Sequence, residues 1–423
     1  MPARAPLLDE LQWRGLLHQQ TDGLAAHLVK GPVTAYCGFD PTAPSLHVGN
    51  LVPVMGLVHL QRAGHRPIAL VGGGTALIGD PSGKSAERPL IGADEVAANS
   101  AALREQLGRF LDFSGAKGAL MRDNAEWLGE VRAVTFLRDV GKHFTVNYML
   151  AKESVQARLE SGISFAEFSY MLLQAYDFLW LFRREGATLQ LGASDQWGNI
   201  TAGTELIRRA AGGEAHGLTL PLLTTTSGKK FGKSEAGAVW LDATRTSPYR
   251  FYQFWVNTDD ADAGRLLRMF TLLPRGDAVE LERALTKAPH EREAQKALAH
   301  EVTTRVHGAD AARVAESVSR VIFDKKTDPS AIGDDVYATL TAEIPCVRSA
   351  AAKDGELSVL DVLEGAFGLS RSAGRKLVQQ GGVTVNGEKV AAAALTVPRA
   401  KAVRGRWFLV RKGGRDIALA ELS

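Results

Sequence analysis

The sequence predicts an α/β protein with a doubly wound parallel sheet, followed by an α-helical domain and a small α+β domain. Residues 33–39 alternate in character and are rich in β-forming residues, which predicts a strand. A helix-like apolar period follows from Val48 to Gln61, and the apolar run Ile68 to Val71 predicts the next strand. Strand, helix and strand in this order are typical of a parallel sheet, which binds ligands in a crevice at the carboxyl ends of its strands.

Later segments extend this pattern. ATLQLGA at 187–193 predicts another strand, with a polar turn and helix-like sequence after it. From Ser247 to about Val321 the pattern becomes helical. Near the end of the chain, Ser370 is expected to cap a helix and Gly381 to end it. Asn386-Gly387, between two short β-like runs, predicts a hairpin turn.

Composition excludes several classes of protein. Apolar residues make up 45% and charged residues 23% of the 423 residues, which is the balance of a globular protein of two or three domains. No apolar run approaches the roughly 20 residues that cross a bilayer, and the first residues lack the apolar core of a signal peptide. The two cysteines, Cys37 and Cys346, form neither a disulfide framework nor a Cys-rich zinc site. We therefore expect a cytoplasmic protein with no membrane association and no structural metal.

Positive charge is concentrated late in the chain. Residues 355–423 hold eleven Lys and Arg against six Asp and Glu, whereas residues 1–354 hold 39 basic and 41 acidic residues. Such a module is expected where a protein meets a polyanion. A solvated, lysine-rich surface is the simpler alternative, and charge alone favours it slightly.

A first motif lies where the predicted strand gives way to the helix, and reads Pro44-Ser45-Leu46-His47-Val48-Gly49-Asn50. A helix N-terminus presents unpaired N–H groups and favours anionic phosphate. His47 adds a donor, Gly49 lets a ligand lie against the backbone, and Asn50 can bond a sugar hydroxyl. Taken alone, a capped helix with an incidental histidine explains the motif equally well.

A second motif reads Lys229-Lys230-Phe231-Gly232-Lys233-Ser234. Its three lysines offer mobile positive charge that could close over a pyrophosphate leaving group. The alternative is an ordinary exposed basic loop. A third segment, GDPSGKS at 79–85, superficially suggests a P-loop, but that motif requires Gly at the position of Ile78.

Together and in this order, the first two motifs resemble the HIGH and KMSKS signatures of class I aminoacyl-tRNA synthetases, in the forms HVGN and KFGKS. Four longer segments are similar to the bacterial-type tyrosyl-tRNA synthetase family: YCGFDPTAPSLHVGNL at 36–51, EFSYMLLQAYDFLWL at 167–181, LQLGASDQWGNI at 189–200 and SPYRFYQFWVNTDD at 247–260. The resemblance runs from the first domain through the C-terminal module. It implies activation of L-tyrosine with ATP to tyrosyl-adenylate, then transfer to the 3′ end of tRNA(Tyr).

The residues agree with a pocket for tyrosine. Tyr170, Gln174 and Asp177 stand at i, i+4 and i+7, so one face of a helix carries all three polar groups. Its other positions, including Met171 and Leu172, are apolar. Because buried polar groups need partners, the three residues form an internal network, an exposed stripe, or a pocket for an amino acid with a polar para group.

The resemblance implies a role for each matching residue. Tyrosine would be held by Tyr36, Asp80, Tyr170, Gln174, Asp177 and Gln196, with Tyr36 and Asp177 on its phenolic hydroxyl. ATP would be held by Cys37, Gly38, Asp40, His47, Gly49, Asn50, Gly192, Asp195 and Lys233. The groups expected to act on the leaving pyrophosphate are Thr42, His47, Lys84, Arg88, Lys230 and Lys233. Mg²⁺ would accompany ATP.

The resemblance also implies a domain plan and a homodimer. The expected parts are a Rossmann-like class I catalytic domain at 1–246, an α-helical anticodon-side domain at 247–323, a linker region at 324–354 and an S-four-like RNA-binding domain at 355–423. In the last of these, Arg371 and Arg375 are one helical turn apart, with Lys376 beside them. These three residues are expected to bind tRNA.

Two other classes of function stay open from the sequence. One is an RNA-binding or splicing cofactor that keeps the fold without the activity, although intact His47, Lys230 and Lys233 argue against it. The other is a class I ligase for a different amino acid, above all tryptophan. ATP–pyrophosphate exchange with each amino acid in turn would discriminate the three.

Overall fold

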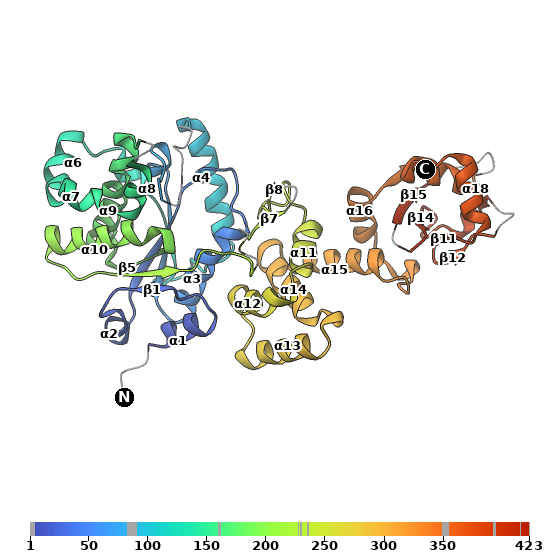
Figure 1. The fold of residues 1–423 in the computed structure, drawn as a ribbon, viewed down its shortest axis with the longest axis horizontal. Helices are drawn as coiled ribbons and strands as arrows, with labels where there is room; N and C mark the ends of the chain where they lie inside the picture. Colours follow the sequence, from blue (N-terminus) through green and yellow to red (C-terminus); the bar gives the residue numbers. More distant parts are fainter. Residues whose placement is uncertain are drawn as a thin grey trace. The chain divides into compact units, whose positions relative to one another are not determined.

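The chain divides into two compact units in a computed structural model, drawn in Figure 1. One unit comprises residues 1–246 with 254–306, and the other comprises residues 247–253 with 307–423. The described residues are 5–82, 91–159, 162–226, 228, 231–234, 237–348, 355–391, 395–414 and 416–422.

The first unit is built on a six-stranded sheet with strand order β1-β6-β5-β2-β3-β4. All neighbours are parallel except β1 with β6. From β2 the chain winds outward to β3 and β4, then returns to the other side of β2 for β5 and β6, so the order reverses between β2 and β5. The strands are β1 (Gln19–Gln20), β2 (Thr34–Phe39), β3 (Arg66–Val71), β4 (Leu120–Asp123), β5 (Ala187–Ala193) and β6 (His216–Leu220).

Some helices of the first unit pack on this sheet, and others come after its last strand in the sequence. They are α1 (Pro6–Trp13), α2 (Leu24–Val29), α3 (Leu51–Arg62), α4 (Ala93–Leu107), α5 (Ala125–Leu128), α6 (Ala133–Asp139), α7 (Val146–Leu150), α8 (Glu153–Leu159), α9 (Phe165–Glu185), α10 (Trp197–Ala211), α12 (Asp260–Phe270), α13 (Arg275–Lys287) and α14 (Glu293–His307). Single 3₁₀ turns are η1 (Val48–Asn50), η2 (Thr75–Leu77), η3 (Gly141–His143), η4 (Ser194–Gln196) and η5 (Pro289–Glu291). Among the described residues, no helix is long and apolar enough to cross a membrane.

Local signals explain the bounds of α9, which carries the polar helix face predicted above. The Ser164 side chain accepts a hydrogen bond from the N–H of Glu167 and begins the helix. Gly186, with a φ of 67°, ends it in the left-handed conformation that glycine adopts without strain. The buried face of α9 packs on α10 and β5, where Phe178 and Leu181 have no exposed surface.

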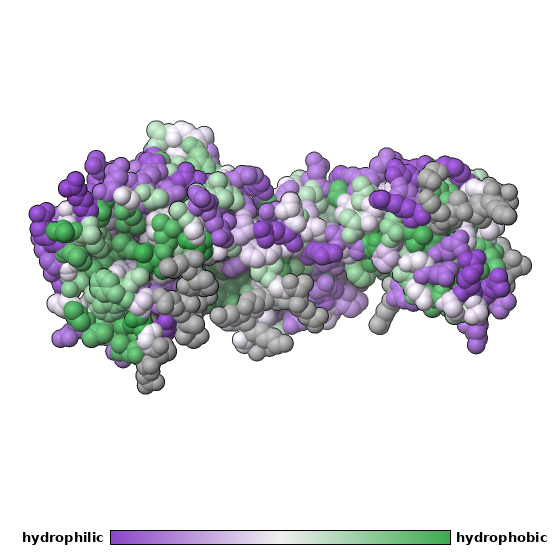
Figure 2. Space-filling view, turned by 90° about the horizontal axis from the view of Figure 1, so that it is seen from above, coloured by the Kyte–Doolittle hydropathy of each residue, from purple (hydrophilic) through white to green (hydrophobic). Residues whose placement is uncertain are grey.

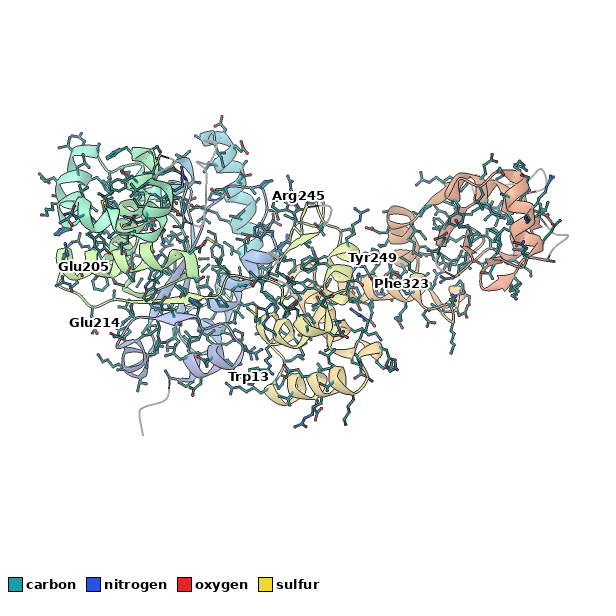
Figure 3. The ribbon with its side chains drawn as sticks, viewed as in Figure 1. Trp13, Glu205, Glu214, Arg245, Tyr249 and Phe323 are labelled. Atoms are coloured by element: carbon teal, nitrogen blue, oxygen red, sulfur yellow. The ribbon has the colours of Figure 1, made fainter. Side chains whose placement is uncertain are left out.

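The N-terminal helix ties the helices after residue 254 to the sheet domain, and Figure 3 labels Trp13 at its end. The buried guanidinium of Arg14 donates to the carbonyls of Arg268, Thr271 and Leu273, at distances of 2.9, 2.7 and 3.0 Å. These carbonyls lie at the carboxyl end of α12 and just beyond it, where a helix leaves acceptors unpaired. Consequently α12 is fixed to α1 by hydrogen bonds as well as by packing.

The second unit contains a five-stranded sheet with order β12-β11-β14-β15-β9, and a two-stranded sheet of β10 and β13. Its strands are β9 (Cys346–Arg348), β10 (Leu357–Ser358), β11 (Val383–Val385), β12 (Glu388–Lys389), β13 (Thr396–Val397), β14 (Trp407–Lys412) and β15 (Asp416–Glu421). Its helices are α15 (Ala309–Phe323), η6 (Pro329–Ala331), α16 (Asp334–Glu343), α17 (Val359–Phe367), α18 (Arg371–Gln379) and η7 (Arg399–Lys401). Helix α11 (Pro248–Val256) spans the boundary of the two units.

The predicted fold class is confirmed, and so are several local signals. The strand predicted at 187–193 is β5, and the other predicted strands are β2 and β3. Ser370 caps α18 by accepting from the N–H of Ala373. Asn386 and Gly387, with φ values of 51° and 85°, form the turn between β11 and β12, as the primed turn of a hairpin requires.

The segment predicted as a linker, 324–354, contains η6, α16 and β9. Strand β9 pairs in parallel with β15. The ring of Tyr337 on α16 stacks on that of Trp407, with centroids 5.6 Å apart and planes 6° apart. The four-domain plan itself stays a prediction, and the two compact units divide the predicted helical domain between them.

Candidate active site

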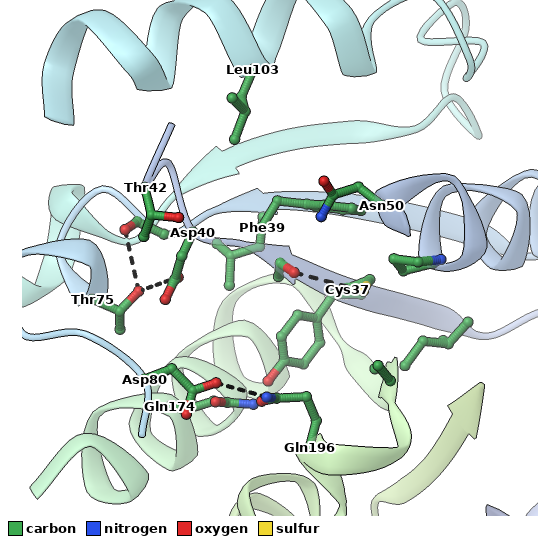
Figure 4. Close-up of a pocket in the computed structure, with 18 of the residues that line it drawn as sticks. Cys37, Phe39, Asp40, Thr42, Asn50, Thr75, Asp80, Leu103, Gln174 and Gln196 are labelled. Atoms are coloured by element: carbon green, nitrogen blue, oxygen red, sulfur yellow. Dashed lines mark hydrogen bonds between the residues drawn. The ribbon is translucent and has the colours of Figure 1, made fainter. Parts of the chain in front are cut away.

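A cavity of about 360 Å³ lies at the carboxyl ends of β2 and β5, where the strand order reverses (Figure 4). Fourteen of the predicted residues line it: Tyr36, Cys37, Gly38, Asp40, Thr42, His47, Asn50, Asp80, Tyr170, Gln174, Asp177, Gly192, Asp195 and Gln196. Gly49 stands beside it and donates to His47. Lys84, Arg88 and Lys230 lie outside the described residues, and of Lys233 only the backbone, in β7 (Lys233–Ser234), is described.

One end of the cavity carries two buried polar side chains. The side chains of Tyr36 and Asp177 are 1% and 2% exposed. Among the described residues, the Tyr36 hydroxyl has no hydrogen-bond partner. A buried hydroxyl without a partner costs free energy, so this end of the cavity is built for a ligand that supplies the missing bond.

Asp177 is oriented by two donors from the segment after β4. Asn124 donates from Nδ2 at 2.9 Å, and the Trp127 indole donates from Nε1 at 2.7 Å. The Trp127 ring is stacked on Trp180, with centroids 4.0 Å apart. With both carboxylate oxygens engaged and the indole held in place, Asp177 has a fixed position.

Burial dominates the ionisation of this end. The pKa of the Asp177 carboxyl is raised to about 8, above all by burial; the bonds from Asn124 and Trp127 oppose the rise, and the carboxylates of Asp40 and Asp123 add to it. Burial also raises the pKa of the Tyr36 hydroxyl well above its ordinary value, with Asp177 adding to the effect. Tyr36 therefore stays a neutral hydrogen-bond donor and acceptor.

A second set of polar side chains also lines the cavity. The Gln196 amide donates to Asp80 at 2.7 Å, and Asp80 also accepts from the backbone N–H of Ser82 at 2.9 Å. Asn199 donates to the side-chain oxygens of Gln174 and Gln196, at 3.0 and 3.2 Å. Figure 4 shows Asp80, Gln174 and Gln196 converging from three different segments. A carboxylate and amide oxygens in this arrangement suit an ammonium group.

Asp40 joins a third set of contacts. It accepts from the Tyr170 hydroxyl at 2.7 Å and from the Thr75 hydroxyl at 2.9 Å. Burial and then the Asp40 and Asp80 carboxylates raise the pKa of Tyr170 well above its ordinary value. Gly72 is required beside this group, because a Cβ there would lie 1.9 Å from an Asp40 oxygen.

The HVGN motif forms the start of η1 and α3. The Nδ1 atom of His47 accepts the N–H of Gly49 at 3.1 Å, and the N–H of His47 donates to the Asn50 side chain at 3.0 Å. Because Nδ1 is an acceptor, the ring proton resides on Nε2, which makes that nitrogen a donor. The motif thus combines a helix start with a side-chain donor at the cavity.

The KFGKS segment lies directly against this motif. A Cβ on Gly232 would stand 2.6 Å from Val48, so only glycine permits this approach. Val239 donates its N–H to the Gly232 carbonyl and accepts the N–H of Val48, both at 3.0 Å. The backbone of the second motif is therefore hydrogen-bonded to that of the first through Val239.

Sequence reasoning missed the residues that hold the predicted ones. Thr75, Asn124, Trp127 and Asn199 orient Asp40, Asp177 and the glutamines. One signal was available: Asn124 directly follows β4, and side chains after neighbouring parallel strands share one edge of a sheet.

The predicted tRNA-binding residues lie on α18. Arg375 and Lys376 are exposed. Arg371 is exposed as well, but its guanidinium contacts Asp361 at 2.6 Å and Glu364 at 3.6 Å. An RNA phosphate at Arg371 would have to compete with two carboxylates, which the sequence did not indicate.

Comparisons with known proteins agree with this geometry. Residues 29–324 match the family of class I tRNA synthetases (W and Y), and residues 338–420 match the SYY-like C-terminal domain of tyrosine–tRNA ligases. The tyrosine–tRNA ligases of Anaeromyxobacter dehalogenans (strain 2CP-C) and Bacillus caldotenax are each 51% identical over 418 residues, which is 98% of this chain and 99% of theirs.

A solved structure is also similar. The C-terminally truncated mitochondrial tyrosyl-tRNA synthetase of Aspergillus nidulans aligns with a TM-score of 0.69 and 32% identity, over 75% of this chain and 94% of that one. The fold and the cavity at the switch point thus define a class I aminoacyl-tRNA synthetase. Within that class, the chain belongs to the tyrosine–tRNA ligase family.

Proposed function

We propose that the chain activates L-tyrosine with ATP in the cavity between β2 and β5, and then transfers the tyrosyl group to the 3′ end of tRNA(Tyr). The observation that carries this proposal is the buried pair of Tyr36 and Asp177 in a cavity that His47 and Asn50, at the start of η1 and α3, also line. A helix start of this kind suits a phosphate. Full-length similarity to tyrosine–tRNA ligases favours tyrosine over tryptophan as the amino acid.

The phenolic hydroxyl of tyrosine would bond Tyr36 and Asp177. Phenylalanine would leave the Tyr36 hydroxyl without a partner and would give Asp177 no bond beyond those from Asn124 and Trp127. A site of this kind rejects it strongly, and tyrosyl-tRNA synthetases are the standard example of such rejection. Asp80, Tyr170 and Gln174 would hold the ammonium group, and Gln196 would lie near the carboxylate. The contact between Asp80 and Gln196 at 2.7 Å supports a shared amino acid site.

In the first step, the tyrosine carboxylate attacks the α-phosphorus of ATP. A new carboxyl–phosphate bond forms, the bond between the α-phosphorus and the bridging oxygen breaks, and pyrophosphate leaves. No side chain has to act as a nucleophile, because the carboxylate is already ionised. Catalysis must therefore come from positioning and from charges aimed at the transition state.

Thr42 and His47 would contact the phosphate that becomes the leaving group, with His47 donating from Nε2 because its Nδ1 accepts the N–H of Gly49. Lys84, Arg88, Lys230 and Lys233 would add positive charge. Cys37, Gly38, Asp40, Gly49, Asn50, Gly192 and Asp195 would hold the adenosine part. Mg²⁺ would enter with ATP as part of the substrate. Since the proposed substrates are ATP, tyrosine and tRNA, the cytoplasm is the proposed location.

Pyrophosphate exchange tests this assignment. The protein should exchange label with tyrosine and much less with tryptophan or phenylalanine. His47→Ala should slow adenylate formation far more than it weakens tyrosine binding, whereas His290→Ala, which alters an exposed histidine, should change neither. If His47→Ala instead weakened tyrosine binding and left the rate of adenylate formation unchanged, the role given to His47 would be contradicted.

The C-terminal module is proposed to bind tRNA through α18, with affinity that falls as salt rises. Its removal should spare adenylate formation and impair charging. Deleting residues 355–423 would also strip β9 of its partner β15 and Tyr337 of its stack on Trp407. A truncation at residue 324 removes these elements together and is the cleaner test, and full charging by the truncated protein would refute the assignment.

A homodimer is the proposed assembly. Large apolar side chains of α6, α7 and α9 are exposed, with Val134 at 79% and Phe165 at 76%. Leu137 and Val146 extend the set, and Figure 2 shows hydrophobic residues gathered over this part of the first unit. Exposed apolar patches of this kind are typical of protein interfaces, and a second copy of the chain is the partner that the family resemblance implies.

Light scattering after gel filtration tests this assembly. The protein should elute with the mass of two chains, and Val134→Glu together with Phe165→Glu should shift it to one. Val29→Glu, at an exposed apolar residue of α2, should leave the mass of two chains intact. A monomeric parent protein would refute the proposal.

A further inference from the structure

A buried carboxylate of α12 is bonded to the segment that leads into the KFGKS motif. Asp262 is 1% exposed. Its two oxygens accept the backbone N–H of Thr226, each at 3.2 Å, and one also accepts the Thr226 hydroxyl at 3.3 Å. Arg265, one turn along α12, donates to Asp262 at 2.9 Å and also to the carbonyl of Thr224.

This pattern differs from ordinary helix capping. Asp262 occupies the third position of α12, from which an acidic side chain usually reaches back to the N–H of the capping residue. In α12 the cap residue Asp259 makes no side-chain capping bond, and both Asp262 oxygens turn to Thr226 instead. Capping therefore does not explain why this carboxylate is buried.

The helix that carries Asp262 is itself fixed. Its carboxyl end accepts three hydrogen bonds from Arg14, which is 4% exposed. Within the lysine motif, the carbonyl of Gly232 accepts the N–H of Val239, whose own carbonyl accepts the N–H of Val48. Thr226 and Gly232, which precede and follow Lys229 and Lys230 in the sequence, are thus each hydrogen-bonded to another part of the first unit.

We propose that Asp262 is a positioning residue for adenylate formation, because it sets where the lysine-bearing segment starts relative to the cavity. The inference rests on the proposed function, in which the lysines of this segment stabilise the leaving pyrophosphate. Asp262 touches no substrate and acts through Thr224 and Thr226.

A positioning role has a kinetic signature. Charges that act on the leaving group matter most in the transition state, so their displacement lowers kcat with little change in KM or in substrate affinity. A misplacement of about 1 Å costs roughly 100-fold in rate. Asp262→Asn turns one acceptor oxygen into an amide donor, which cannot bond the N–H of Thr226, so we expect adenylate formation to slow by about 10- to 100-fold.

The experiment measures pyrophosphate exchange and tyrosine affinity in the full-length chain. Asp262→Asn should lower kcat and leave the tyrosine Kd and the KM for ATP within about 2-fold. Asp277→Asn, at an exposed residue in the first turn of α13, is the matched control and should change none of them. Thr226→Val removes only the hydroxyl bond and should give a smaller effect of the same kind, which keeps the test valid if Asp262→Asn folds poorly.

A double mutant tests whether Asp262 acts through its bonds to Thr226 or by a separate route. If Asp262 acts through Thr226, the two substitutions together should slow the step by less than the product of their separate effects. An unchanged kcat, equal losses of kcat and tyrosine affinity, or strictly multiplicative effects would each overturn the inference. Lys233→Ala distinguishes a failure of the proposed function from a failure of this inference. If Lys233→Ala does not slow exchange, the role given to the lysines is wrong. If Lys233→Ala slows exchange but Asp262→Asn does not, only the role of Asp262 is rejected.

Discussion

Replacing Tyr36 with phenylalanine should weaken tyrosine binding without destabilising the empty protein. In the unliganded chain the Tyr36 hydroxyl is buried and has no partner among the described residues. Its removal relieves a desolvation cost of up to about 1–3 kcal/mol, and the smaller ring still packs edge-on against Phe178, whose ring centroid lies 5.2 Å away. The free energy of unfolding should therefore stay constant or increase.

Binding should respond in the opposite direction. A hydrogen bond between two neutral hydroxyls contributes about 0.5–1.5 kcal/mol, so the Kd for tyrosine should rise by about 2- to 13-fold. The affinity for phenylalanine should not fall, because that ligand never made the bond. Discrimination between the two amino acids should shrink by the same factor.

Urea unfolding gives the stability, and equilibrium fluorescence gives the two affinities. Tyr176→Phe is the control, since Tyr176 lies on α9, is only partly buried and lines no part of this cavity. It should leave the tyrosine Kd unchanged. A Tyr36→Phe protein that binds tyrosine as tightly as the parent, or that loses more than about 1 kcal/mol of stability, would refute the reasoning.

Three further outcomes follow from the geometry. The Asp177 carboxyl has its pKa raised to about 8, so the folded state keeps a proton that the unfolded chain has lost. Its stabilising contribution is complete below about pH 4 and disappears as the pH rises through 8. In urea melts, the free energy of unfolding of the parent protein should therefore fall over this window relative to that of Asp177→Asn. The same pH dependence in both proteins would disprove this prediction. Gly72→Ala would force a Cβ to within 1.9 Å of Asp40, and should cost roughly 1–3 kcal/mol in thermal melts and reduce exchange activity; an active, equally stable variant would contradict this. Arg375→Ala should weaken tRNA binding and lower the salt slope of the affinity by about 1, which filter binding at several salt concentrations would detect.

Much of the site could be predicted because its motifs are local. The seven residues 44–50, which contain the HVGN motif, indicate a helix start and a side-chain donor close to the end of a strand. In the structure His47 and Asn50 of this segment line one cavity. The polar face of α9 was visible as helical spacing alone. Neither inference needed a contact between distant parts of the chain.

The residues that support the site could not be found in this way. Asn124 and Trp127 are about 50 residues from Asp177 in sequence, and no motif marks them. They reach Asp177 because β4 lies beside β3 in the sheet, which the strand pattern does not reveal. Likewise, Asp262 could not be linked to Thr226 without the packing of α12.

The predicted linker illustrates a different limit. Asp328 and Pro329 begin η6, and Gly333 stands before α16, whose first turn contains Asp334 and Asp335. What they cannot show is that Tyr337 meets Trp407, 70 residues later, or that β9 is completed by β15. A sequence pattern reports local conformation, whereas membership in a sheet depends on a distant partner.

The place of β15 affects how the protein is made. Among the described strands this one comes last in sequence order, yet it lies inside its sheet, with β14 on one side and β9 on the other. During synthesis β9 leaves the ribosome roughly 70 residues before the strand that completes it, and its backbone donors and acceptors must wait for that strand. The six-stranded sheet of the first unit has all its strands long before then, so a nascent chain holds that sheet complete while the five-stranded sheet of the second unit is still open.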